Sequence, residues 1–210
     1  MTLTTDAPTT RRQIRTRVLL PAVGLIAAAA AQIDAAITTN AFRSVSPAPE
    51  DSVNFPWYGE LAGQISTWWS FTGLFLVLGF TAFARSTALR QARSGRAGAW
   101  AAVVGAALLV VAHFLSAANA DAMMDDGIAM VVVSLFASAT LLLGAGLTTA
   151  GVATVRSGAW SGVRRYVPLA NGIWPLLMMV LIFTPFLPIA VGILAALQVA
   201  LGATLIAEEA

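Results

Sequence analysis

The stretch HFLSAANADAMMDDG, residues 113–127, contains the single histidine of the chain and three of its ten acidic residues. A histidine beside a buried carboxylate can titrate near neutral pH, and grouped carboxylates raise the local concentration of cations. Asp34 and Ser134 fall at a comparable depth in two other apolar stretches. We therefore hypothesise an ion or proton site made of Asp34, His113 and Ser134, below an outer cation rim made of Asp121, Asp125 and Asp126.

A simpler interpretation gives the same residues structural roles. Asp34 and His113 would then form hydrogen bonds between helices, or Asp34 would be hydrated near the membrane surface. The aspartate-rich turn would be a solvated hairpin between two membrane spans. The sequence leaves both interpretations open.

Several kinds of chemistry are excluded because the chain has no cysteine and no lysine. Disulfide frameworks, thiolate metal sites, cysteine nucleophiles and Schiff bases to retinal or pyridoxal all need one of these residues. A single histidine excludes bis-histidine haem, and the zinc, serine-hydrolase and nucleotide-binding signatures are missing. We expect no catalytic residue, no metal and no cofactor. The alternative is a membrane enzyme in which Asp121, Asp125 and Asp126 bind a metal.

The composition indicates a membrane protein. Hydrophobic residues make up 58% of the 210 positions and charged residues only 10%, against about 25% charged residues in a soluble domain. A membrane-spanning helix needs about 20 mostly apolar residues. The sequence predicts an all-α, polytopic membrane bundle of six transmembrane helices, with spans at about 18–39, 66–84, 98–118, 128–154, 167–184 and 187–206.

Two longer segments lie outside these spans. Residues 1–16 are polar and are predicted to form a disordered cytoplasmic tail before a single transmembrane domain over 17–210. The connection at about 40–65 contains three prolines and is predicted to be an irregular loop. Span one also has the basic start and Ala-x-Ala sequences of a cleaved signal peptide. Its apolar run continues past Asp34, longer than an ordinary signal core, so we expect the span to be retained.

The arginines predict the orientation of the bundle. Arg43 lies on one side, and the other arginines precede span one or lie between spans two and three and between spans four and five. Cytoplasmic loops are enriched in arginine and lysine, so both termini are predicted to be cytoplasmic in a bacterial cytoplasmic membrane. Candidate contacts for anionic lipid headgroups are Arg85, Arg90, Arg93, Arg96, Arg164 and Arg165.

Small and polar residues within the spans are predicted to hold the helices together. Glycines recur in span four, at Gly144, Gly146 and Gly151, and amides occur at Asn171 and Gln198. In lipid, close packing of small residues and hydrogen bonds between helices supply the association that hydrophobicity cannot. We expect static helix contacts at these positions.

The stretch SGVRRYVPLANGIWPLL, residues 161–177, resembles the start of the fifth span in small six-helix integral membrane proteins of actinobacteria. The arrangement of basic inner loops and short outer loops is similar as well. This resemblance implies a plasma-membrane protein, and it implies no activity and no functional residue.

The sequence favours a non-enzymatic accessory or interaction subunit, because few charges lie within the membrane and no span is clearly broken. The alternative is a small cation- or proton-linked permease or channel that uses the outward-facing polar site. The expected partners are the lipid bilayer and either another membrane protein or further copies of the chain. Nucleic acid is not expected as a partner.

Overall fold

The structure is a computed structural model that describes residues 7–181 and 184–209. These segments are all-α, which confirms the membrane bundle predicted from the sequence. The helices are α1 (Ala7–Phe42), α2 (Gly59–Ala84), α3 (Arg93–Ala118), α4 (Gly127–Ser157), α5 (Val167–Met178) and α6 (Leu187–Glu209). Three short 3₁₀ turns accompany them, namely η1 (Thr87–Leu89), η2 (Gly162–Tyr166) and η3 (Met179–Leu181).

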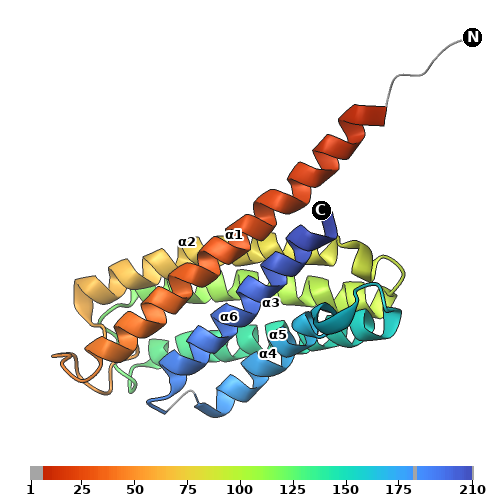
Figure 1. The fold of residues 1–210 in the computed structure, drawn as a ribbon. Coiled ribbons are helices and arrows are strands. Elements are labelled where there is room, and N and C mark those ends of the chain that lie inside the picture. The colour runs from red at the N-terminus through yellow and green to blue at the C-terminus, as the bar shows by residue number, and fades with distance from the viewer. Residues whose placement is uncertain (1–6, 182–183, 210) are drawn as a thin grey trace, which may run out of the picture.

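Five of these helices are long and apolar enough to cross a membrane, and α5 is the exception. The sequence predicted a span over 167–184, but the α-helix ends at Met178 and continues as the 3₁₀ turn η3. Pro175 lies inside α5 and lacks the N–H that would bond to the carbonyl of Asn171, which weakens the helix at this point. The helix α5 still runs alongside α4 and leads the chain toward the opposite end of the bundle (Figure 1).

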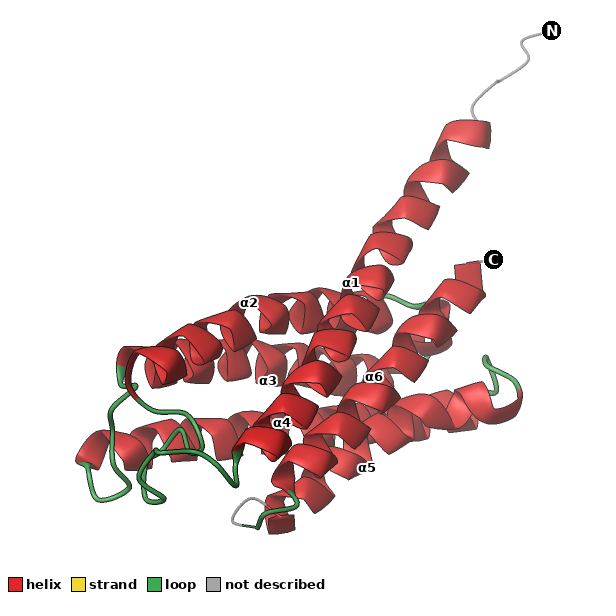
Figure 2. Ribbon diagram, turned by 60° about the vertical axis from the view of Figure 1, so that its left-hand side comes forward, coloured by secondary structure: helices red, strands yellow, loops and turns green. Residues whose placement is uncertain are grey.

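The first helix is the longest in the described segments. It begins at Ala7, within the stretch 1–16 that the sequence assigned to a tail, and residues 1–6 lie outside the described segments. Its 36 residues extend about 54 Å at 1.5 Å per residue. The N-terminal part of α1 therefore projects beyond the other helices (Figures 1 and 2).

The helices form a closed ring in which each packs against the next and α6 packs extensively against α1. The α2–α3 turn, the α4–α5 loop, the start of α1 and the end of α6 lie at one end of the bundle (Figures 1 and 2). We call this the arginine end because it carries Arg85, Arg90, Arg93, Arg96, Arg156, Arg164 and Arg165. We call the other the acidic end because it carries Glu50, Asp51, Glu60, Asp121, Asp125 and Asp126.

Neighbouring helices approach closely at glycines. A Cβ built on Gly98 of α3 would lie 2.6 Å from the Gly146 carbonyl oxygen, and one built on Gly146 of α4 would lie 2.5 Å from the Gly98 carbonyl oxygen. A Cβ on Gly172 of α5 would meet the backbone nitrogen of Thr148 at a still shorter distance. At these positions one backbone rests directly on another, which is the close packing expected for helices in lipid.

The main apolar cluster lies in the half of the bundle toward the arginine end. Within this cluster the aromatic rings of Phe83 and Trp160 pack together, with centroids 5.9 Å apart. Its largest fully buried members are Leu25, Phe80, Phe83, Leu89, Leu143, Leu147, Leu201 and Leu205. Toward the acidic end the buried set includes hydroxyl groups, at Ser66, Ser70 and Ser116.

We predict that Gly172→Ala forces α4 and α5 apart. The free energy of unfolding should fall by roughly 1–3 kcal/mol, the range for overpacking a close contact. Gly192→Ala is the matched control, because a Cβ there would lie 3.7 Å from the Cβ of Ala36, an ordinary contact. Thermal unfolding in detergent, followed by circular dichroism, should show a lower midpoint for the first variant alone. Equal midpoints would contradict the contact.

Candidate functional site

The acidic end is organised by a loop and a hairpin that pair with each other. The loop, residues 43–58, follows α1, and the hairpin, residues 119–126, joins α3 to α4. They exchange two backbone hydrogen bonds, of 3.0 and 2.8 Å, on either side of an isolated antiparallel bridge between Ser52 and Met123. The aspartate-rich hairpin is therefore tied to the proline-rich loop rather than free in solvent.

The side chain of Asn54 fixes the loop to two helices. Its Oδ1 accepts hydrogen bonds from the hydroxyls of Ser116 on α3, at 2.6 Å, and of Ser66 on α2, at 3.4 Å. Its Nδ2 is buried and has no hydrogen-bond partner in the described part of the chain. A half-buried polar contact thus sets the position of the loop.

His113 packs against two aromatic rings. Its ring stacks on Trp69 of α2, with centroids 5.8 Å apart and an interplanar angle of 11°, and meets Phe136 of α4 edge-on at 4.8 Å and 75°. Such pairs contribute about 0.5–1.5 kcal/mol beyond the area that they bury. The imidazole therefore joins α2, α3 and α4 by packing.

Asp34 and Ser134, the other members of the hypothesised ion site, are exposed on α1 and α4. Ser70 and Thr72, which lie at a similar level, donate to carbonyls of their own helix. Asp34, His113 and Ser134 thus have separate surroundings, on three helices. A joint ion or proton site stays a prediction.

The three rim aspartates also differ in their surroundings. The Asp126 carboxylate accepts a hydrogen bond from the Met123 backbone nitrogen at 2.8 Å, inside the hairpin, and Asp125 is exposed. Asp121 lies beside the first residue of α2, where a Cβ on Gly59 would be 3.3 Å from its Oδ1. Among the described residues no group of three acidic or histidine side chains is arranged to hold a metal ion.

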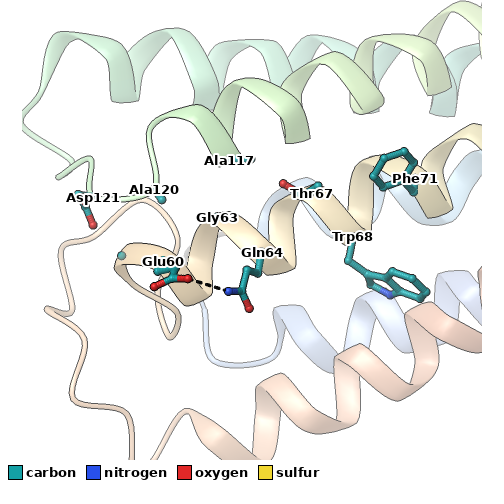
Figure 3. Close-up of a pocket in the computed structure, with 10 residues that line it drawn as sticks. Glu60, Gly63, Gln64, Thr67, Trp68, Phe71, Ala117, Ala120 and Asp121 are labelled. Atoms are coloured by element: carbon teal, nitrogen blue, oxygen red, sulfur yellow. Dashed lines mark hydrogen bonds between the residues drawn. The ribbon is translucent and has the colours of Figure 1, made fainter.

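An open groove of about 620 Å³ runs along the first turns of α2, beside the last turn of α3 and the start of the hairpin (Figure 3). Carboxylates lie at one end of it, from Glu60 and Asp121, and aromatic rings lie at the other, from Trp68 and Phe71. Glu60 Oε1 accepts a hydrogen bond from the Gln64 amide at 3.1 Å. The groove therefore has an acidic end and an apolar end along one helix.

The sequence pattern did not predict this groove, although Asp121 is one of the candidate rim residues. Glu60, Gln64, Trp68 and Phe71 recur at the three- and four-residue spacing of one helix face. The predicted second span began at residue 66, which left the first half of this face in a loop. The α2 helix begins at Gly59. Extending the helix back would have revealed the face.

The arginine end carries the predicted headgroup contacts. Arg165 is half-buried, and the exposed members are Arg85, Arg90, Arg93, Arg96 and Arg164. The guanidinium of Arg85 lies over the Trp100 ring at 5.8 Å, and that of Arg165 lies over the Tyr166 ring at 4.7 Å. Arginine and aromatic residues are both favoured at membrane interfaces. Binding of lipid headgroups stays a prediction.

Asn171 joins α5 to α6, as expected of a buried amide. Its Nδ2 donates to the Leu197 carbonyl at 2.8 Å, and Trp174 Nε1 donates to the Ala190 carbonyl at 2.8 Å. Asn171 Oδ1 and Gln198 Oε1 are buried without a hydrogen-bond partner in the described segments. Two side-chain hydrogen bonds thus cross directly from α5 to the backbone of α6.

Family models give no match to the chain, and neither curated proteins nor solved structures match it. The structure supports the general part of the resemblance found in the sequence, a helical membrane protein with five candidate spans. It identifies no family.

We predict that a disulfide forms between Ser52→Cys and Met123→Cys under mild oxidation. The chain has no native cysteine to interfere, and bridged antiparallel residues lie about 4.5–5.5 Å apart at Cα, within disulfide range. The matched control pairs Ser52→Cys with Thr149→Cys, farther along α4. Gel mobility before and after reduction measures the bond. A folded double variant that does not cross-link would contradict the pairing of loop and hairpin.

We predict that His113→Phe keeps the parent's stability, whereas His113→Ala loses roughly 2–4 kcal/mol by leaving a cavity between Trp69 and Phe136. The reason is that the ring contacts are aromatic and phenylalanine preserves them. Thermal unfolding in detergent measures both. If the phenylalanine variant were as unstable as the alanine variant, the ring nitrogens would be required and the packing role would be wrong.

Proposed function

We propose that the protein is a non-enzymatic accessory subunit that binds another membrane protein through the outward face of α1. The chain is a multi-pass membrane protein with five candidate spans. The observation that supports the proposed role is the exposed side chain of Asp34, which lies within the candidate span Val18–Phe42.

An exposed carboxylate at this position needs a partner. Asp34 lies two turns before α1 ends at Phe42, about 12 Å along the helix axis. Ionisable residues in membrane helices almost always face the bundle interior or a water-filled cavity, because an aspartate at the helix centre costs about 2.5–3.5 kcal/mol. A hydrogen-bond donor on a neighbouring helix would remove much of this cost.

The residues around Asp34 suit helix packing. Exposed positions recur at intervals of three and four residues, the spacing of a helix–helix seam. We call these positions the α1 face: Leu20, Val23, Ala27, Ala30, Asp34 and Ile37. Apolar side chains need no partner in lipid, whereas a carboxylate among them does. Ala27 and Ala30 would let a second helix approach closely beside it.

The orientation belongs to the same proposal. The arginine end faces the cytoplasm, in accordance with the enrichment of arginine in cytoplasmic loops, and its exposed arginines contact anionic headgroups there. The membrane is the bacterial cytoplasmic membrane. Asp34 then lies in the half of the bilayer away from the cytoplasm, where the partner must present its donor.

We predict that a photo-crosslinking residue at Val23 captures one membrane protein of constant mass in native membranes. The same residue at Val111 of α3, which is exposed to a similar extent (52% against 54%), is the control and should not capture it. Asp34→Leu should abolish the adduct, and Asp34→Asn should preserve part of it because the amide still forms hydrogen bonds. Native mass spectrometry measures the adducts.

Three outcomes would contradict this proposal. Equal adducts from Val23 and Val111 would indicate random collision in the membrane. An adduct that persists in Asp34→Leu would show that the carboxylate plays no part. An adduct of twice the protein's own mass would replace the accessory role with self-association.

A further inference from the structure

The groove between α2 and α3 lies apart from the α1 face and has its own chemistry. One of its ends is acidic and the other is aromatic (Figure 3). We propose that it binds a long-chain amine, meaning an amphiphile with one positively charged amine headgroup and one apolar tail. This ligand site is independent of the accessory role.

The acidic end of the groove lacks a countercharge. Glu60 and Asp121 contribute two carboxylates, and no arginine is among the described residues that line the groove. Arg43, the single arginine of this end of the bundle, lies elsewhere, over the Phe55 ring at 5.1 Å. A protonated amine would be attracted by both carboxylates and would donate a charge-assisted hydrogen bond to one of them, whereas an anionic headgroup would be repelled.

The other end suits an apolar tail. Trp68 and Phe71 are 59% and 52% exposed, so their exposed ring surfaces can contact a ligand, although the Phe71 ring also meets Phe114 edge-on with centroids 6.1 Å apart. Gly63 lines the groove between the exposed rings and the carboxylates, where a Cβ would already be in ordinary contact, 3.5 Å from the Ala117 carbonyl oxygen and 3.6 Å from the Ala120 Cβ.

The change from polar to apolar groups along the groove runs in the same direction as the change from the surface of the bilayer to its interior. The α2 helix runs from Glu60 at the acidic end of the bundle toward Phe71, deeper in a candidate span. Polar groups therefore lie near the membrane surface and apolar groups lie deeper. An amphiphile inserted in the membrane has the same order of head and tail, so it can enter the groove sideways from lipid without reversing.

The test is calorimetric titration of the full chain in nanodiscs of neutral lipid, with empty nanodiscs as the blank. Dodecylamine should bind saturably to the parent. Glu60→Gln combined with Asp121→Asn should weaken binding at least about tenfold, as expected for loss of charge-assisted contacts. Asp125→Asn is the matched control, because it removes a charge from the same end but lies outside the groove, and it should bind as the parent does.

Two further measurements separate the groove from charge alone. Gly63→Leu fills the groove without changing any charge and should abolish saturable binding, with circular dichroism confirming that the variant is folded. Dodecanol and dodecanoate have the same tail without the positive charge and should show no saturable binding. Parent-like binding by the double variant or by Gly63→Leu would overturn the proposal, and so would equal binding of dodecanol.

Discussion

A bilayer offers no water to backbone N–H and C=O groups, and this constraint determines most of the structure. The chain satisfies these groups within helices, so the described segments contain no sheet in the membrane region. Lipid tails are as apolar as leucine, so the helices gain little from hydrophobic association and must fit one another closely. The contact between Gly98 and Gly146 is the clearest result, because each backbone occupies the space in which the other's side chain would lie. The close packing of the helices determines where the ends of α2 and α3 leave the bundle.

At the acidic end, backbone N–H and C=O groups find hydrogen-bond partners outside helices. The loop 43–58 satisfies part of its backbone through the hairpin 119–126, and Asn54 anchors it to α2 and α3. One side of the groove is thereby held in place, because Asp121 belongs to the hairpin and lies beside Gly59 at the start of α2. The position of the Asp121 carboxylate thus depends on the half-buried amide of Asn54, which anchors the loop that pairs with the hairpin.

Hydropathy was sufficient to predict the fold class and most of the spans, since every long helix carries a run of apolar residues. It could not predict where α2 begins, because Glu60 and Gln64 are polar and the helix extends past the apolar run at that end. It also missed the effect of Pro175 on α5 and the buried amide of Gln32, which is 5% exposed on α1. The joint site of Asp34, His113 and Ser134 stays a prediction for a related reason. Depth in the membrane was readable from the sequence, but the side of the helix on which Asp34 lies depends on how α1 packs.

The closed ring also affects how the protein is made. Helices enter the membrane in the order of synthesis, and α1 comes first while its extensive partner, α6, comes last. Until α6 is inserted, the face of α1 that it covers, including the small residues at Ala22 and Ala36, has only lipid beside it. The helix α1 must therefore stay in the membrane without its main partner while the four helices α2 to α5 are inserted. Completion of the bundle is a late event, and a truncation that removes α6 leaves the first helix without its main neighbour.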